Sequence, residues 1–254
     1  MYAAERQRGI YDLARRKGRV SVAGLAREFD VTTETIRRDL DYLNNQGVLH
    51  RVHGGAVIAQ NVALTETGLA DREPAYAAQK NRIAAAAMEF LPGVSGSVLV
   101  DAGTTTARLA AMLTPDSART VITGSVPVAG HLIGNGLNIQ LLGGRVRGIT
   151  GAAVGADTVA AISQLRCDVA FVGVNGLSVT HGLSTPDPDE AAVKHAMVNA
   201  AKQVIVLADS SKIGAELLVS FAAVSDVDVL VTDADVAADD RDQLEAAGVQ
   251  VVIA

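Results

Sequence analysis

From residue 97 to the last residue, short apolar runs alternate with stretches of helical periodicity, and few architectures accommodate that order. The strand-like runs are SVLVDAG, TVITGS, NIQLLGG, DVAFVGVNG, QVIVLADSS, VDVLVTD and VQVVIA. The predicted helices between or beside them are TTTARLAAML, PVAGHLIGNG, GADTVAAISQL, DEAAVKHAMVNAA and DRDQLEAAG. Strands that alternate with helices in this way predict an α/β domain built on a mostly parallel sheet.

The composition supplies an aliphatic core and excludes several classes of protein. Hydrophobic residues make up 49% of the chain, but aromatic residues make up only 3%, so the core must consist of Ala, Val, Leu and Ile. No apolar run approaches the ~18 residues of a membrane-spanning helix, and the opening MYAAERQRGI lacks the apolar centre of a signal peptide. The single cysteine, Cys167, fits a reducing compartment. We therefore expect a soluble cytoplasmic protein with no membrane partner.

Polar residues and glycines gather where the predicted strands end. In parallel sheets, ligands bind beyond these carboxyl ends. The candidates there are Asp101, Gly103, Thr104, Thr105, Thr106, Ser125, Arg145, Arg147, Asn175, Gly176 and Lys212. Backbone N–H groups at a helix start, hydroxyls and cations together suit an anion such as phosphate. One such loop is more often an ordinary turn, but five loops at one edge favour a binding site.

Two further candidates, Glu190 and Lys194, lie four residues apart on one predicted helix. They form either a solvated ion pair, worth a few tenths of a kcal/mol, or part of the pocket. The chain has no GxxxxGK[ST] or GxGxxG motif, so a nucleotide site is not expected. We expect no metal and no cofactor, because the histidines fall in separate predicted elements: His131, His181 and His195.

The N-terminal part of the chain differs from the rest in charge. Residues 1–57 carry ten Arg or Lys and seven Asp or Glu, a net charge of +3, within a chain whose net charge is -6. The remainder therefore carries -9. A basic segment on an acidic body is typical of a module that binds a polyanion, although chance clustering of surface charge gives the same numbers.

Helical periodicity divides this basic segment into three helices. The first spans residues 3–17, the second follows Ser21 as a plausible cap, and Thr32 or Thr33 can cap the third. Their apolar faces comprise Ile10, Leu13 and Ala14, then Val22, Leu25, Ala26 and Phe29, then Ile36, Leu40 and Leu43. The second and third helices are joined by a short turn, so residues 20–39 predict a helix-turn-helix.

The third helix carries the candidate DNA contacts Thr33, Thr35, Arg37 and Arg38. Arg38 projects almost opposite the apolar face, and arginines near the start of a second helix suit guanine edges or phosphates in a DNA groove. The alternative is that both arginines only pair with neighbouring acids. Asp39 lies nearer the apolar side, so we expect it to bind a partner within the same domain.

A hairpin is predicted after the third helix. Residues 48–49 and 56–58 are apolar and flank a His-Gly-Gly turn, which makes the module a winged helix. Arg51 and His53 would lie near the tip of the wing and add to the candidate DNA contacts. A histidine alone is more often a packing or surface residue. The interpretation of His53 as a DNA contact therefore depends on its position in the wing.

Arg6-x-Arg8, SVAGLAREFDVTTETIRRDL and RVHGGAV closely resemble the DNA-binding domain of DeoR-family bacterial transcriptional regulators. The resemblance continues in VDAGTTT, ITGSVPVA, LLGGRVRG, DVAFVGVNGLS, HGLSTPD and LADSSKIG, which are similar to the sensor domain of that family. It implies a sensor fold similar to ribose-5-phosphate isomerases and CoA-transferase-type proteins, double-stranded operator DNA as partner and a phosphorylated sugar as effector. HGLSTPDPDEAAVK resembles actinobacterial members that control fructose-uptake operons, so a fructose phosphate is the first effector to try.

These observations predict a domain plan. Residues 1–57 would be the DNA-binding domain, 58–80 a linker, and 81–254 the domain for effector sensing and oligomerisation. Helix-turn-helix proteins usually bind paired half-sites, so we expect a homodimer or homotetramer. In the pocket, Thr104, Thr105 and Thr106 with Arg145 and Lys212 would hold the phosphate. The sugar hydroxyls would go to Asp101, Asn175 and Glu190.

The leading hypothesis is a repressor of a sugar operon that a phosphorylated sugar releases from DNA. The alternative is an enzyme of the sugar-phosphate isomerase or deaminase type with a DNA-binding appendage. Asp101, Glu190, Asp209 and Lys212 are capable of acid–base chemistry. The resemblance is to the non-catalytic sensors, however, and a shared fold does not imply activity. We therefore expect no enzyme activity.

Overall fold

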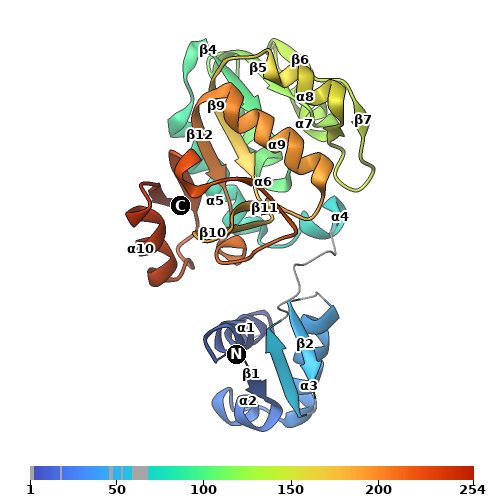
Figure 1. Cartoon of the computed structure of the whole chain (residues 1–254), viewed down its shortest axis with the longest axis vertical. Helices are drawn as coiled ribbons and strands as arrows, with labels where there is room; N and C mark the ends of the chain where they lie inside the picture. The colour runs from blue at the N-terminus through green and yellow to red at the C-terminus, as the bar shows by residue number, and fades with distance from the viewer. Residues whose placement is uncertain (1–2, 18, 46–47, 53, 59–67) are drawn as a thin grey trace. The chain divides into compact units, whose positions relative to one another are not determined.

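The computed structural model describes residues 3–17, 19–45, 48–52, 54–58 and 68–254. The chain divides into two compact units, residues 1–65 and 66–254. Figure 1 labels the helices and strands of both units. Within the described ranges, no helix combines the length and apolar character needed to cross a membrane.

The first unit is a winged helix. Its elements are α1 (Ala3–Lys17), β1 (Arg19–Ser21), α2 (Val22–Glu28), α3 (Thr33–Asn45), β2 (Leu49–Val52) and β3 (Gly55–Ile58). The three strands form one antiparallel sheet in the order β1-β3-β2. The predicted apolar faces form a single core, in which Ala26 and Phe29 are only partly buried. The predicted helix-turn-helix and hairpin are confirmed, whereas β1 was not predicted because three residues are too few for a strand pattern.

Side-chain caps and one buried ion pair fix the helices of this unit. The Ser21 hydroxyl accepts a hydrogen bond from Gly24 N at 3.1 Å, and the Thr32 hydroxyl accepts one from Thr35 N at 3.2 Å. Asp39 accepts a hydrogen bond from Arg6 Nε at 2.5 Å, and this contact raises the pKa of Arg6. The prediction that Asp39 has a partner within its own domain is therefore confirmed.

The second unit begins with helices and is built on a seven-stranded sheet. Its helices are α4 (Leu69–Arg72), α5 (Ala77–Ala87), η1 (Met88–Phe90), α6 (Thr104–Met112), α7 (Val126–Leu132), α8 (Ala156–Ser163), α9 (Pro188–Ala200), η2 (Ser210–Lys212), η3 (Val224–Asp226) and α10 (Ala238–Ala246). The strands of the sheet are β4 (Gly93–Val100), β5 (Ala118–Thr123), β6 (Ile139–Leu141), β9 (Cys167–Gly173), β12 (Ala201–Leu207), β14 (Val229–Thr232) and β15 (Gln250–Ile253).

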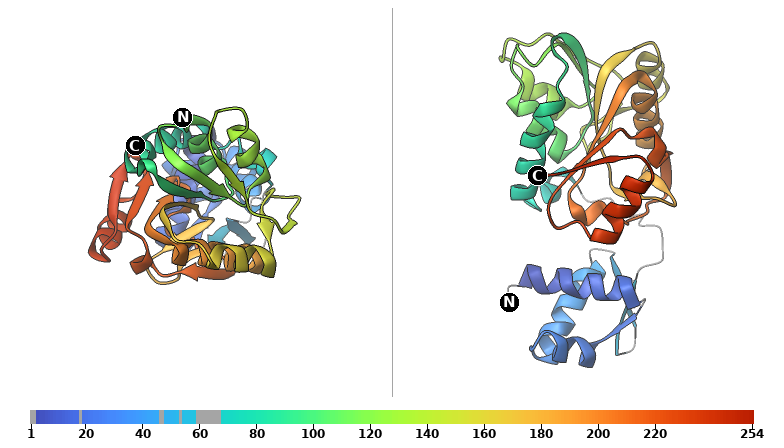
Figure 2. Two further views of the ribbon diagram at one scale, coloured as in Figure 1. Left: turned by 90° about the horizontal axis from the view of Figure 1, so that it is seen from above. Right: turned by 90° about the vertical axis from the view of Figure 1, so that its left-hand side faces the viewer.

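All neighbouring strands in this sheet are parallel, in the order β15-β14-β12-β9-β4-β5-β6. The predicted mostly parallel α/β sheet is thus confirmed. Figure 2 shows helices on both of its faces. One aliphatic core joins α5, α6 and α7 to the sheet, and a second core joins α8 and α9 to the opposite face. Phe171 of β9 is fully buried in the first of these cores.

Two small antiparallel sheets were not predicted. One pairs β7 (Arg145–Val146) with β8 (Ala153–Val154). The other has the order β10-β11-β13 and comprises Gly176–Ser178, Gly182–Thr185 and Val219–Ala222. These strands have two to four residues and partners distant in sequence, so alternation within one window does not reveal them. Helix α4 and the start of α5 also lie within the 58–80 segment that the sequence predicted as a linker.

Candidate functional site

The parallel sheet brings the five predicted loops to its carboxyl edge. Asp101 follows β4, Ser125 follows β5, and Arg145 follows β6. Asn175 and Lys212 follow β9 and β12, which lie beside one another in the same sheet. The two candidates on α9 are both buried, with Glu190 in the first turn of that helix and Lys194 one turn further along. Candidate residues that are spread along the sequence from Asp101 to Lys212 therefore lie at one edge of the sheet.

Asp101 and Lys194 form an ion pair in the interior of this edge. Each residue is 4% exposed, and the Lys194 ammonium donates to the Asp101 carboxylate. Lys194 Nζ also donates to Gly173 O at 2.9 Å and lies 5.7 Å from the centre of the Phe221 ring. Gly173 N donates to Asp101 at 2.9 Å. Burial raises the pKa of Asp101, and the charge of Lys194 opposes that rise.

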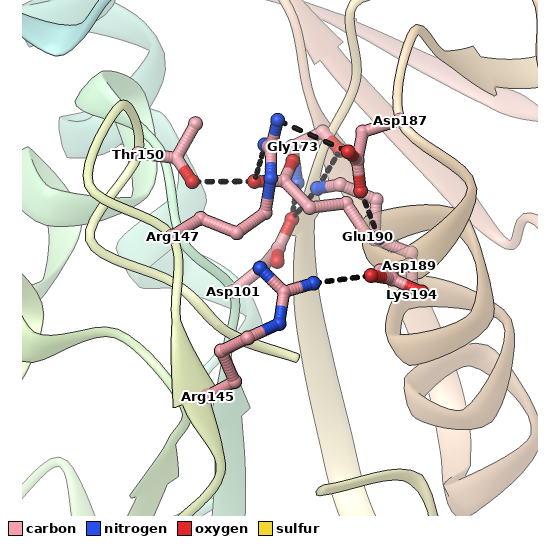
Figure 3. A network of polar contacts seen from close by, with 9 residues as sticks. All are labelled: Asp101, Arg145, Arg147, Thr150, Gly173, Asp187, Asp189, Glu190 and Lys194. Carbon is pink, nitrogen blue, oxygen red and sulfur yellow. Dashed lines mark hydrogen bonds and ion pairs between the residues drawn. The ribbon is translucent and has the colours of Figure 1, made fainter. Parts of the chain in front are cut away.

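A second set of ion pairs joins the β7–β8 hairpin to the start of α9 (Figure 3). Arg147 binds Glu190 through Nη1 and Asp187 through Nη2, the latter at 3.1 Å. The Thr150 hydroxyl also donates to Glu190. Glu190 and Lys194 are thus not a solvated pair with each other, because each binds an oppositely charged residue from another segment.

Arg145 lies at the margin of this network. Its guanidinium pairs with Asp189, and both side chains are largely exposed. In Figure 3 the two arginines approach from one side and the carboxylates of α9 from the other, with Asp101 between them. A small hollow beside the network is lined by Asp101, Ala102, Ala152, Ala153, Val154, Glu190, Val193 and Lys194. The predicted residues Asp101, Glu190 and Lys194 therefore surround one space.

The loop after β4 supplies the start of α6. Gly103 is its N-cap and provides no side-chain cap, so the first-turn N–H groups of the helix have no such partner. Thr104, Thr105 and Thr106 are buried, and the Thr106 hydroxyl donates to Gly103 O at 3.1 Å. This turn can bind an anion through backbone N–H groups, whereas the Thr106 hydroxyl is already engaged.

Two other predicted residues have structural roles. The Ser125 hydroxyl caps α7 by accepting from Val128 N at 3.3 Å. Gly176 lies where an added Cβ would be 2.5 Å from Ala215 O, so a larger residue would not fit. Asn175 is half-buried, and its backbone N donates to Ser184 O at 3.1 Å. Within the described part of the chain, the Asn175 side chain makes no hydrogen bond of its own.

The sequence did not single out a cluster around Lys80. This residue lies in the first turns of α5, is 4% exposed, and donates to the backbone carbonyl of Arg72. Burial lowers the pKa of Lys80 to about 8, with Asp209 opposing and Lys212 reinforcing that shift. Burial also lowers the pKa of Lys212. The sequence did contain a sign that Lys80 is buried. Lys80 shares helical spacing with Ile83, Ala84 and Ala87 and so occupies the apolar face of its helix.

In the first unit, α3 presents both predicted arginines to solvent. The side chains of Arg37 and Arg38 are 53% and 80% exposed, and they lie 3.4 and 3.8 Å from Glu34. Thr33 is the exposed first residue of the helix, and Thr35 Oγ1 is 2.9 Å from the capping Thr32 hydroxyl. Weak, exposed pairs with Glu34 leave the guanidinium groups able to exchange that partner for DNA.

Arg51 lies on β2 and reaches back to α3. Its guanidinium donates to Arg37 O at 3.0 Å and to Asp41 at 2.9 Å, so it braces the wing against the helix. His53 lies outside the described residues. Of the six predicted DNA contacts, the structure therefore places four on α3 and one on the adjacent strand.

Comparison with known proteins identifies both units. Residues 6–62 match the DeoR-like helix-turn-helix domain, and residues 76–234 match the DeoR C-terminal sensor domain. The HTH-type transcriptional regulator GlpR of Haloferax volcanii is 37% identical over 253 residues, covering 99% of this chain and 98% of the relative. The glycerol-3-phosphate regulon repressor of Escherichia coli is 33% identical over 235 residues, covering 92% of each chain.

A third relative, the uncharacterized HTH-type transcriptional regulator FruR of Bacillus subtilis, is 34% identical and covers 92% of this chain and 93% of its own. Among solved structures, ribose 5-phosphate isomerase A from Neisseria gonorrhoeae aligns with a TM-score of 0.40 at 15% identity, over 53% of this chain and 52% of that one. The two domain matches and the relatives that span nearly the whole chain show that this protein belongs to the DeoR family of transcriptional regulators.

Proposed function

We propose that the protein represses an operon for the uptake or breakdown of a sugar or related polyol, and that a phosphorylated metabolite releases it from DNA. The observation that carries the DNA-binding half is the exposed arginine pair on α3, opposite a fully buried Ile36 and Leu40. Relatives named "Glycerol-3-phosphate regulon repressor" and "Putative aga operon transcriptional repressor" support the class of operon. A fructose phosphate is the first effector to test, by resemblance.

The proposed division of labour follows the two units. Residues 1–57 bind the operator, 58–80 connect, and 81–254 sense the effector and oligomerise. Thr33, Thr35, Arg37, Arg38, Arg51 and His53 are the proposed DNA contacts. One winged helix contacts few base pairs, so we propose a homodimer or homotetramer that binds paired half-sites.

The proposed effector site lies at the carboxyl edge of the sheet. Its ligand is an anion, because this edge combines the uncapped first turn of α6 with several buried or half-buried cations. We propose that Asp101, Asn175 and Glu190 bind the sugar hydroxyls, after Asp101 and Glu190 release their present partners. We propose no enzyme activity, since Asp101 and Glu190 are engaged by Lys194 and Arg147 and the relatives are named as regulators.

Alanine substitution of the arginine pair tests the DNA-binding half. Arg37→Ala or Arg38→Ala should weaken binding to operator DNA, selected from genomic fragments by the parent protein, by about 1–3 kcal/mol, because each removes a base-edge or phosphate contact. The thermal midpoint should stay unchanged, since both side chains are exposed.

Arg241→Ala is a matched control, because Arg241 is also an exposed helical arginine paired with a nearby acid, but in the second unit. Its operator affinity should equal that of the parent. Parent-like operator affinity in both α3 variants would remove the assignment of α3 as the DNA-reading helix.

A further inference from the structure

Two lysines of the second unit are equally buried but neutralised differently. Lys80 and Lys194 are each 4% exposed. Lys194 forms an ion pair with Asp101, whereas Lys80 donates a hydrogen bond to the Arg72 backbone carbonyl and forms no ion pair with any carboxylate of the described residues. A buried ammonium is strongly disfavoured without an opposite charge, so the Lys80 site as it stands is electrostatically incomplete.

Two more cations lie close enough to Lys80 to affect its ionisation. They are Lys212 and Arg72, and within the described part of the chain neither forms an ion pair. The acids that act on Lys80 are Asp209 and Glu73. Glu73 is already bound by Arg108, which leaves Asp209 as the one carboxylate of this group that no arginine holds, and its charge acts on both Lys80 and Lys212. Three cations against one such carboxylate leave an excess of positive charge.

Contacts to α6 bring this cluster to the proposed effector edge. Arg108, on α6, donates to Glu73 O at 3.0 Å and to Asn81 Oδ1 at 2.6 Å. These partners adjoin Arg72 and Lys80 in sequence. Arg108 lies one helical turn beyond Thr104, so the cluster is held next to the first turns of α6. Lys212 reaches the cluster from the carboxyl end of β12, which belongs to the same sheet edge.

The arginines at the other side of this edge are less suited to a ligand. Arg147 binds Asp187 and Glu190, and Arg145 binds Asp189, so each already has an internal counterion. An anion that bound there would have to displace a carboxylate. At the Lys80 cluster an anion would instead supply the charge that the protein omits.

We infer that Arg72, Lys80 and Lys212, beside the first turn of α6, form the subsite that holds the phosphate group of the effector. This inference rests on the proposed function, since it names the part of the effector site that reads the phosphate. Charge-assisted hydrogen bonds from ammonium and guanidinium groups to a phosphate dianion are stronger than those to a neutral hydroxyl. The low pKa of Lys80, about 8, agrees with an ammonium that lacks its counterion.

Inorganic phosphate tests the subsite directly on the full chain. Phosphate at millimolar concentration should raise the thermal midpoint of the parent more than sodium chloride at equal ionic strength, because it binds only the native state. In Lys80→Met the phosphate-specific rise should be lost, and affinity for glycerol 3-phosphate or fructose 1-phosphate, by calorimetry, should fall about 10- to 100-fold. Lys202→Met is the control, because Lys202 is an exposed lysine paired with Asp168.

Lys212→Met gives a second variant at a less buried position, so the test does not depend on Lys80→Met folding. Loss of the phosphate response in either folded variant, with the control unchanged, supports the subsite. A parent without a phosphate-specific rise, or folded variants that respond like the parent, overturns it. If phosphosugars release operator DNA from parent and both variants alike, only the subsite is wrong; if no phosphosugar releases the parent, the proposed function fails.

Discussion

Along α9, Lys194 and Arg147 lie against the carboxylates of Asp101 and Glu190, whereas at the start of α5 Lys80 lies against a backbone carbonyl. Both regions belong to the same edge of one sheet, and Lys80 and Lys194 are equally buried. The difference lies in what the chain itself supplies. Around α9 the chain contributes both members of each pair, so the charges hold segments together. Around α5 it contributes an excess of cations, which fits a site that is completed by a ligand.

The largest expected effect comes from breaking the internal pair. Lys194→Ala should lower the free energy of unfolding by about 3–5 kcal/mol, because it leaves the Asp101 carboxylate buried without its partner. Urea unfolding at neutral pH measures this loss. Lys202→Ala, which removes an exposed lysine from its pair with Asp168, should cost no more than about 1 kcal/mol. If Lys194→Ala lowered the free energy of unfolding by a similarly small amount, the Lys194–Asp101 pair would not hold segments together in the way described.

A smaller effect is expected from pH at the unneutralised lysine. The pKa of Lys80 is about 8 in the folded chain, below its ordinary value of 10.5, so the unfolded chain binds more protons between these values. The free energy of unfolding therefore receives a contribution from Lys80 that rises from about pH 8 to about pH 10.5, by about 3 kcal/mol in total. Asp209 and Glu73 act against the lowered pKa, and Lys212 and Arg72 act with it.

Comparison with Lys80→Met isolates this contribution. The free energy of unfolding of the parent minus that of Lys80→Met should increase as the pH rises through that window. Urea unfolding at several pH values measures this difference. A difference that is constant from pH 7 to pH 10.5 would mean that Lys80 titrates at its ordinary pKa, and the contrast with Lys194 would then lose its electrostatic basis.

The sequence predicts the elements of this molecule well because their periodicities are local. The helix-turn-helix and the main parallel strands follow from apolar spacing. That Asp39 has a partner within its own domain follows from its place beside the apolar face of α3, although the sequence did not identify that partner as Arg6. The carboxyl-edge loops follow from the same logic, since parallel strands bring their ends together. These patterns therefore predict which face of a helix or strand a residue occupies, and which edge of the sheet a loop reaches.

The pairing of charges is not local, and the sequence does not predict it. Lys194 and Asp101 are 93 residues apart, and Arg147 and Glu190 are 43 apart. Arg145, Arg147 and Lys212 are equivalent in the sequence as cations after strands, yet the structure gives internal carboxylates to the two arginines. The short strands of the β10-β11-β13 sheet were missed for the same reason, because their partners come from distant segments.

Operator release by a phosphosugar, compared between Lys212→Ala and Arg145→Ala, tests the central claim most directly. Operator binding is titrated with and without fructose 1-phosphate, fructose 6-phosphate, glycerol 3-phosphate and free fructose. We predict that an effective phosphosugar weakens operator binding by the parent about 5- to 150-fold, and that Arg145→Ala responds alike. Lys212→Ala should bind the operator normally but fail to respond. A parent-like response in Lys212→Ala, or equal action of free fructose and its phosphates, would contradict the account.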